Sequence, residues 1–171
     1  IKIHPAHVAK SAMERYTDEP AELASIRRAL GLLPGHISII PPTTDINTYS
    51  LFDLMDFCVT VRGTIGIEAA SFGIPVLTGG TGRYDHRGFT VDSESRAEYV
   101  ERLAHIQDIP RLSAAQRELA ERFAYGAFVL RPFPLTSMSI EYERDIEATT
   151  KVTLNAKSSE ELRHAPDLNA F

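Results

Sequence analysis

The sequence predicts an α/β domain with a Rossmann-like, doubly wound and mainly parallel sheet. Two short apolar runs, at residues 57–61 and 74–77, have the composition of strands that are buried on both faces. The residues between them begin with a Gly-Thr turn, suit one short helix and end at Gly73, a residue type that commonly follows a helix. Parallel strands need a crossover connection, so this stretch predicts a βαβ unit.

The segments before this unit alternate between strand and helix, which favours the doubly wound arrangement. Residues 1–3 suit the end of a strand, a helix that begins near Asp18 ends at Gly31, and residues 36–40 suit a second strand. A further helix over residues 45–55 leads into the βαβ unit. We expect its apolar residues, Tyr49 and Phe52 among them, to face the core.

The segments after the unit are a glycine-rich loop, one short strand and several helices. In order, they are a loop at 78–88, a strand at 89–91, and helices at 92–106, 113–129 and 138–149. The helix at 113–129 begins with a capping box formed by Ser113 and Gln116.

Length and composition are those of one ordinary globular domain. The 171 residues suit a domain over residues 1–150, followed by a polar, partly disordered tail over residues 151–171. A formal net charge of −5 predicts no nucleic-acid partner. The single cysteine, Cys58, suits a buried core thiol and excludes a disulfide within the chain. No apolar run is long enough for a membrane span, and the cytoplasm is the expected location.

The turn between the two strands carries the residues best suited to chemistry. Gly63 permits a sharp turn, and Thr64 offers a hydroxyl. The first N–H groups of the helix lack partners within the helix and favour an anion. Glu68 lies one helical turn after Thr64 on the same face. A phosphate at the turn and a hydroxyl-bearing group held by the carboxylate would describe a nucleotide. The alternative is an ordinary strand–helix joint that binds nothing, with Glu68 as a solvated residue.

Other polar residues are predicted near the same edge of the sheet. His4 follows the first strand, and ligands of open parallel sheets bind outside the carboxyl ends of the strands. His4 would therefore share a rim with Thr64 if their strands are neighbours. The glycine-rich loop carries Arg83, Tyr84 and His86, which are suited to contact a phosphate or a sugar. A surface histidine and a solvated loop are the alternatives.

Several motifs occur together in a fixed order. They are His4-Pro5 after a strand, Asp53-Leu54-Met55-Asp56 before a strand, Arg62-Gly63-Thr64-Ile65-Gly66-Ile67-Glu68-Ala69, Gly73-Ile74-Pro75-Val76, and the stretch from Tyr84 to Gly88-Phe89-Thr90. This combination resembles the C-terminal half of bacterial capsule polysaccharide biosynthesis proteins, in the broad group of two-domain GT-B glycosyltransferases. The likeness runs over residues 1–134.

The resemblance implies one Rossmann-like half of a GT-B fold, which binds the nucleotide of an activated sugar. It implies that His4 is the catalytic residue that stabilises or protonates the leaving phosphate. It implies that Glu68 accepts hydrogen bonds from the ribose. The residues implied for phosphate binding are Gly63, Thr64, Ile65 and Gly66. The residues suited to contact the donor from neighbouring loops are Arg62, Arg83, Tyr84 and His86.

The same resemblance implies the substrates and partners. A CMP-sugar such as CMP-Kdo is the first expectation for the donor, and a UDP-sugar is the second. The acceptor would be a capsule or surface polysaccharide or a lipid-linked glycan, held by an N-terminal acceptor domain of the same parent chain. We expect that domain upstream, since the chain begins inside an apparent strand. Neither a metal nor a cofactor other than the donor is expected, and peripheral association with the inner membrane is compatible with this role.

Two other kinds of function share parts of the pattern. The pattern also resembles that of CDP-polyol phosphotransferases, in which a His-Pro pair is followed by a Ser/Thr-rich turn that binds phosphate. Sugar-nucleotide epimerases share a glycine-rich turn and a glutamate with this sequence. A nucleotide-binding or interaction module without activity of its own is the alternative outside enzymes.

Overall fold

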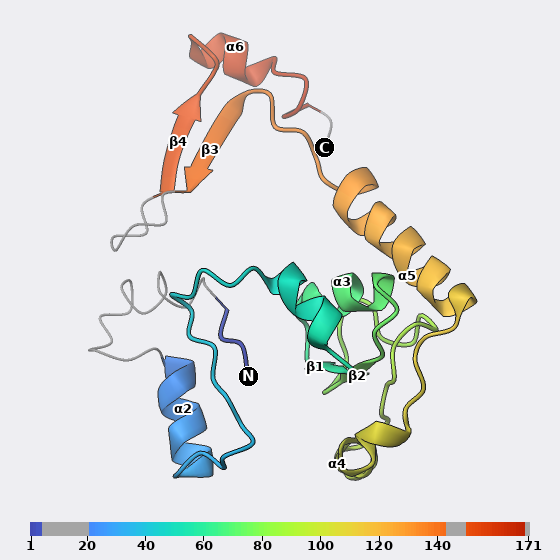
Figure 1. Ribbon diagram of the computed structural model, residues 1–171. Helices are drawn as coiled ribbons and strands as arrows, with labels where there is room; N and C mark the ends of the chain where they lie inside the picture. Colours follow the sequence, from blue (N-terminus) through green and yellow to red (C-terminus); the bar gives the residue numbers. More distant parts are fainter. Residues whose placement is uncertain (5–20, 143–149, 170–171) are drawn as a thin grey trace. The chain divides into compact units, whose positions relative to one another are not determined.

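The computed structural model describes residues 1–4, 21–142 and 150–169, and the chain forms two compact units (Figure 1). The first unit contains residues 1–45 and 133–171, and the second contains residues 46–132. These boundaries differ from the predicted division into residues 1–150 and 151–171. The second unit contains all of the predicted site residues except His4.

The second unit is built around a parallel βαβ unit. β1 (Cys58–Thr60) pairs in parallel with β2 (Val76–Thr78), and α3 (Ile65–Ser71) connects the two strands. Gly73, just beyond α3, has a φ of 80°, which lies in the left-handed region that glycine adopts without strain. These features confirm the predicted strand–helix–strand unit.

The parallel sheet is smaller than predicted. Val91 adds one parallel bridge to Leu77 in β2, and Lys2 forms one parallel bridge with Ile40 in the first unit. A single bridge fixes one residue pair and does not make a strand. Among the described residues, the parallel sheet therefore has two strands, and the structure is mixed α/β. The segments predicted as strands that contribute only bridges are residues 1–3, 36–40 and 89–91.

The core of the second unit lies where α3 packs against both strands and α5 (Ala114–Tyr125). Ala69 and Ala70 on α3 and Ala120 on α5 have no exposed surface, and their small side chains let the two helices approach closely. The buried residues of this core are Phe52, Cys58, Ile67, Ala69, Ala70, Ile74, Val76, Tyr84, Phe89 and Ala120.

Cys58 is a buried core thiol, as predicted from its place in an apolar run. Burial raises the pKa of the thiol to about 11, because a thiolate loses its hydration in the core. Cys58 is therefore a packing residue and not a nucleophile at neutral pH.

The helix before β1 differs in type from the prediction. η1 (Thr48–Leu54) is a 3-10 helix, and the side chain of Asn47 caps it by accepting a hydrogen bond from the N–H of Tyr49 at 2.9 Å. Of its residues, Phe52 is buried, but Tyr49 is 53% exposed. With three residues per turn, Tyr49 and Phe52 lie on one stripe of η1, and the Tyr49 ring packs against Phe52 from outside the buried core, with the ring centroids 5.4 Å apart. The expectation that Tyr49 faces the core is therefore wrong.

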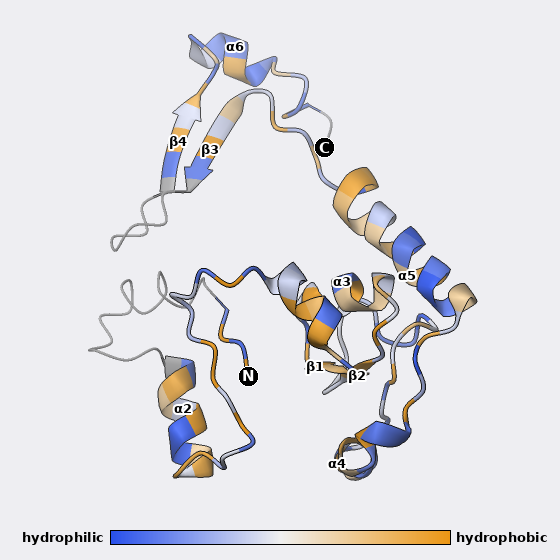
Figure 2. Cartoon of the chain, viewed as in Figure 1, coloured by the Kyte–Doolittle hydropathy of each residue, from blue (hydrophilic) through white to orange (hydrophobic). Residues whose placement is uncertain are grey.

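The helices predicted over residues 92–106 and 113–129 are present in the second unit as shorter α-helices. α4 (Arg96–Ala104) is capped by Ser95, and η2 (Ile106–Asp108) follows it. α5 begins with the predicted capping box, in which Ser113 N–H donates to Gln116 Oε1 at 3.0 Å and Gln116 N–H donates to Ser113 Oγ at 3.3 Å. η3 (Gly126–Leu130), a π-helical turn, extends α5, and Figure 2 shows the change from the polar middle of α5 to this apolar end.

The first unit contains α2 (Ala21–Leu30), which ends at Gly31 with a φ of 63°, as predicted. The predicted helix start at Asp18 lies outside the described residues. β3 (Met138–Tyr142) pairs in antiparallel with β4 (Thr150–Leu154), and α6 (Ser159–Arg163) follows. The prediction of a helix over residues 138–149 is therefore wrong for its described part, where β3 lies. Within the predicted polar tail over residues 151–171, the structure has most of β4 and all of α6.

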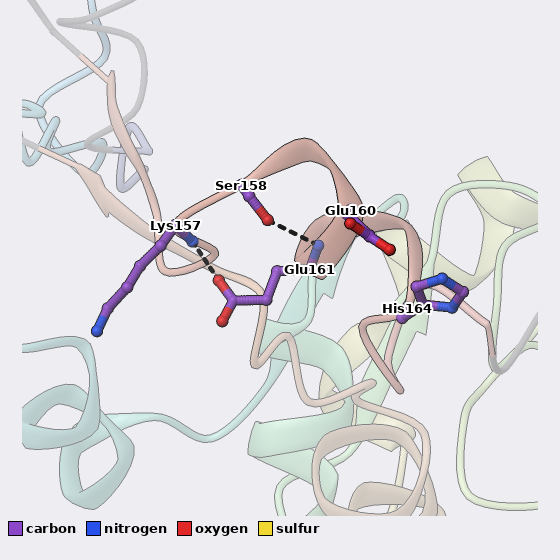
Figure 3. Close-up of a pocket in the computed structure, with 5 residues that line it drawn as sticks. All are labelled: Lys157, Ser158, Glu160, Glu161 and His164. Carbon is purple, nitrogen blue, oxygen red and sulfur yellow. Dashed lines mark hydrogen bonds between the residues drawn. The ribbon is translucent and has the colours of Figure 1, made fainter.

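Hydrogen bonds from the chain itself order this C-terminal region. Ser158 Oγ caps α6 by accepting from Glu161 N–H at 3.1 Å, and Glu161 Oε2 accepts from Lys157 N–H at 2.6 Å (Figure 3). The buried carboxylate of Asp167 accepts from Ser137 N–H and Thr136 N–H, both at 2.8 Å. These bonds, led by that from the Ser137 backbone, lower the pKa of Asp167 to about 2. None of the helices in the described part of the chain is long and apolar enough to cross a membrane.

Candidate functional site

The turn between β1 and α3 leaves hydrogen-bonding groups at the start of the helix. Thr64 is exposed, has φ and ψ of −57° and −21°, and makes no capping bond with its side chain. Its carbonyl accepts from Ile67 N–H and Glu68 N–H, and the Gly66 N–H donates to the Gly63 carbonyl at 3.1 Å. The N–H groups of Thr64 and Ile65 have no acceptor among the described residues. Two amides and one hydroxyl thus remain available for a ligand.

These hydrogen bonds reduce the number of predicted phosphate-binding residues that have a free N–H group. Gly66 is buried, and its N–H is already used inside the turn. Gly66 therefore shapes the turn and is not placed to donate a hydrogen bond to a ligand. Phosphate binding through the N–H groups of Thr64 and Ile65 stays a prediction, and Gly63 supplies the carbonyl that accepts from the Gly66 N–H.

Tyr84 holds this turn from the protein interior. Its side chain is 1% exposed, and its hydroxyl donates to the Gly63 carbonyl at 2.8 Å. Burial raises the pKa of Tyr84 to about 12, so the hydroxyl stays protonated and remains a donor. A Cβ added to Gly66 would stand 2.6 Å from Cζ of Tyr84, which explains the glycine. The sequence predicted that Tyr84 contacts the sugar donor. Its side chain is buried, so Tyr84 instead supports the turn at Gly63 from inside the protein.

Glu68 lies on the same face of α3 as Thr64, and it interacts with Tyr49 of η1. The pKa of Tyr49 is raised mainly by the negative charge of the Glu68 carboxylate, and further by burial and by a hydrogen bond to Glu68. The Tyr49 hydroxyl is therefore a protonated neighbour of Glu68. The sequence pattern did not identify Tyr49 as a site residue, because its spacing suited the core.

Arg62 lies between the turn and the glycine-rich loop. Its Nε donates to the Thr81 carbonyl at 3.2 Å, and the next loop residue, Gly82, donates its N–H to Asp85 Oδ1 at 2.8 Å. Arg62 therefore joins the turn to the loop and remains exposed, as does Arg83. The structure thus places Arg62 next to the glycine-rich loop, which was also predicted to contact the donor.

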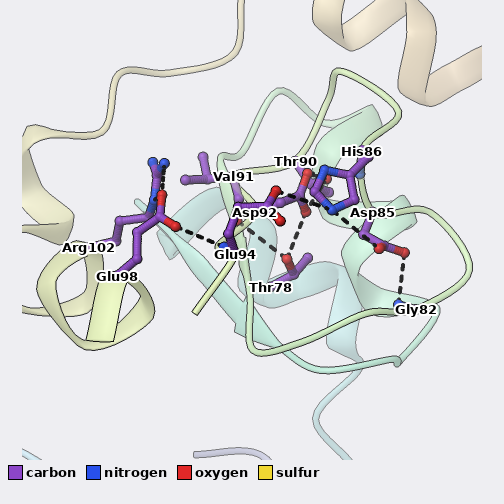
Figure 4. Close-up of polar contacts among 10 residues, drawn as sticks. All are labelled: Thr78, Gly82, Asp85, His86, Thr90, Val91, Asp92, Glu94, Glu98 and Arg102. Atoms are coloured by element: carbon purple, nitrogen blue, oxygen red, sulfur yellow. Dashed lines mark hydrogen bonds and ion pairs between the residues drawn. The ribbon is translucent and has the colours of Figure 1, made fainter. Parts of the chain in front are cut away.

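His86 lies in an acidic part of that loop (Figure 4). Its Nε2 is 3.7 Å from Asp85 Oδ2 and 3.8 Å from Glu94 Oε1, and its φ of 55° is the positive value that histidine adopts more often than most residues. Its N–H donates to Asp92 Oδ2 at 2.9 Å. Three carboxylates near His86 disfavour a phosphate there, and the predicted contact of His86 with the sugar of the donor stays a prediction.

Asp92 organises the loop, although the sequence pattern did not single it out. Its carboxylate accepts from Thr78 Oγ1 at 2.8 Å and from Thr90 Oγ1 at 2.9 Å (Figure 4). Thr78 ends β2 and is 2% exposed. Asp92 thus ties the loop to the carboxyl end of a strand.

His4 is exposed and belongs to the first unit, whereas Thr64 belongs to the second. The predicted pairing of His4 with Thr64 therefore stays a prediction. The described residues contain no cluster of three or more side chains suited to hold a metal ion. The pocket of Figure 3 also lies in the first unit, and none of its lining residues was predicted as a site residue.

The fold of the second unit is that of an α/β protein with a parallel βαβ unit, and the turn between β1 and α3 carries the polar groups described above. The family model of capsule polysaccharide biosynthesis proteins matches residues 36–125, which is more than half of the chain. The chain therefore belongs to the family of capsule polysaccharide biosynthesis proteins. The matched residues include β1, α3, β2 and the glycine-rich loop. No curated protein and no solved structure matches the chain.

Proposed function

We propose that this chain is the donor-binding domain of a capsule glycosyltransferase and that it binds a nucleotide-activated sugar. A CMP-sugar such as CMP-Kdo is the proposed donor, with a UDP-sugar second. The observation that carries the proposal is the turn at residues 63–68, which lies inside the region matched by the family. Unpaired N–H groups, a free hydroxyl and a carboxylate one helical turn further on suit a phosphate followed by a ribose.

The proposed chemistry uses these groups in the bond-breaking step. An acceptor hydroxyl loses its proton and forms a bond to the anomeric carbon of the sugar, the bond from that carbon to the donor phosphate breaks, and the phosphate gains negative charge as it leaves. The N–H groups of Thr64 and Ile65 and the Thr64 hydroxyl would stabilise that charge, because fixed donors need no reorganisation as the charge develops. Glu68 would accept hydrogen bonds from the ribose and so fix the nucleotide in place. Neutral Tyr84 keeps the turn in shape.

Two substitutions test the turn by calorimetric titration of the chain with CMP and with inorganic phosphate. Thr64→Val is expected to weaken CMP binding by roughly 10- to 100-fold, because a hydrogen bond to a charged group is lost. Glu68→Ala is expected to weaken CMP binding by about 10-fold without weakening phosphate binding, because only the ribose bonds are lost.

Thr153→Val, an exposed threonine of β4, is the matched control and should leave both affinities unchanged. If CMP binds and neither Thr64→Val nor Glu68→Ala weakens it, the turn is not the site. If Glu68→Ala weakens phosphate and CMP equally, its effect comes from a damaged fold.

We further propose that His4 stabilises or protonates the leaving phosphate once the two domains of the transferase are assembled. In a parent chain that also carries the acceptor domain, His4→Ala is expected to lower kcat by roughly 100-fold or more, within the range for general acid catalysis. Donor affinity should change much less, because the interaction forms mainly in the transition state. Steady-state kinetics at varied donor concentration separates the two effects, and a change in donor affinity alone would remove His4 from catalysis.

A further inference from the structure

Two aromatic rings lie exposed beside α3. Tyr49 of η1 is 53% exposed, and Phe72, which follows α3, is 56% exposed. Their ring centroids are 6.3 Å apart, with an angle of 48° between the ring planes. The buried Phe52 contacts both rings, at 5.4 Å from Tyr49 and 4.9 Å from Phe72. The two rings are therefore held in place although half of their surface faces solvent, which favours a binding role.

The chemical groups along this face of α3 follow a definite order. Thr64, Glu68 and Phe72 are four residues apart, so they share a face at steps of about 6 Å. The order is a hydroxyl with free amides, then a carboxylate, then an aromatic pair. A nucleotide has the matching order of phosphate, ribose diol and base. The Glu68 charge also keeps a phosphate away from the aromatic end, which fixes the direction in which a nucleotide binds.

We infer that Tyr49 is a binding residue for the nucleoside end of the donor, with its ring as a stacking surface for the base next to Glu68. This inference rests on the proposed function. The Tyr49 hydroxyl uses only part of the acceptor capacity of the Glu68 carboxylate, which has about four lone-pair sites and so retains capacity for the ribose hydroxyls. Stacking tolerates any base, so Tyr49 supplies affinity for a nucleotide and leaves the choice among bases to other groups.

The test compares CMP with ribose 5-phosphate, which has the phosphate and the ribose but no base. Tyr49→Ala is expected to weaken CMP binding by roughly 5- to 100-fold, the usual loss for one stacked base, and to leave ribose 5-phosphate within about twofold. Tyr49→Phe retains the ring and should weaken CMP binding by less than about threefold, because stacking is kept and the hydrogen bond that is lost, to the Glu68 carboxylate, lies within the protein. Tyr125→Ala, at an equally exposed tyrosine of α5, is the matched control and should change neither affinity.

Each result decides the inference. An unchanged CMP affinity in Tyr49→Ala, with Thr64→Val and Glu68→Ala both weakened, overturns the role of Tyr49 and leaves the proposed function in place. Equal losses of CMP and ribose 5-phosphate in Tyr49→Ala would mean that the ring only supports the fold, and this also overturns the inference. If the unmodified chain binds no nucleotide, the proposed function and the inference both fail.

Discussion

Replacing Tyr84 by alanine is expected to lower the free energy of unfolding of the second unit by about 3–5 kcal/mol, the usual cost of truncating a buried aromatic ring. The ring is 1% exposed and is stacked on Phe89, with their centroids 6.3 Å apart. The substitution leaves a cavity beneath the turn and removes the hydrogen bond to the Gly63 carbonyl. Urea unfolding followed by circular dichroism measures the change.

The control for this prediction is Tyr84→Phe, which keeps the ring and removes only the hydroxyl. Its expected cost is about 1 kcal/mol, because one neutral hydrogen bond is lost and the Gly63 carbonyl still accepts from the Gly66 N–H. A cost below about 1 kcal/mol for Tyr84→Ala would contradict the buried position of the ring.

Replacing Gly66 by alanine is expected to destabilise the second unit by about 1–3 kcal/mol, the usual range for overpacking a core. Alanine favours a helix over glycine by about 1 kcal/mol, so helix propensity alone predicts the opposite sign. The steric effect decides the sign, because the new Cβ would stand 2.6 Å from Cζ of the buried Tyr84. The same urea unfolding experiment gives the difference between the variant and the unmodified chain.

Gly126→Ala is the matched control for this substitution. Gly126 also has helical dihedral angles, and a Cβ added there would meet no atom within 4 Å. Gly126→Ala should therefore leave stability unchanged or raise it by up to about 1 kcal/mol. If Gly66→Ala were also neutral or stabilising, the close approach of Tyr84 to the turn would be wrong.

The sequence predicted the βαβ unit well because its signals are local. Apolar runs bounded by Gly-Thr and by Gly73 determine where the strands and α3 begin and end. The capping box of Ser113 and Gln116 is likewise a pattern within one helical turn. These features need no knowledge of distant contacts.

The errors arose where tertiary contacts decide the role of a residue. Nothing near Tyr84 in the sequence reveals that its hydroxyl bonds to Gly63, which lies 21 positions earlier. Tyr49 matched a helical core position, but of the residues of η1 Phe52 takes the buried place, and the Tyr49 ring is half exposed. Residues 138–142 form a strand because β4 is present to pair with it. Long-range pairing of this kind has no local signature.

The central claim is that the N–H groups of Thr64 and Ile65 bind the phosphate of a nucleotide. Amide chemical shifts of the chain, measured during a titration with CMP, test it most directly. The account predicts that the Thr64 and Ile65 resonances shift the most, that Thr153 does not move, and that Thr64→Val weakens the response. A titration in which CMP shifts neither Thr64 nor Ile65 would contradict the account.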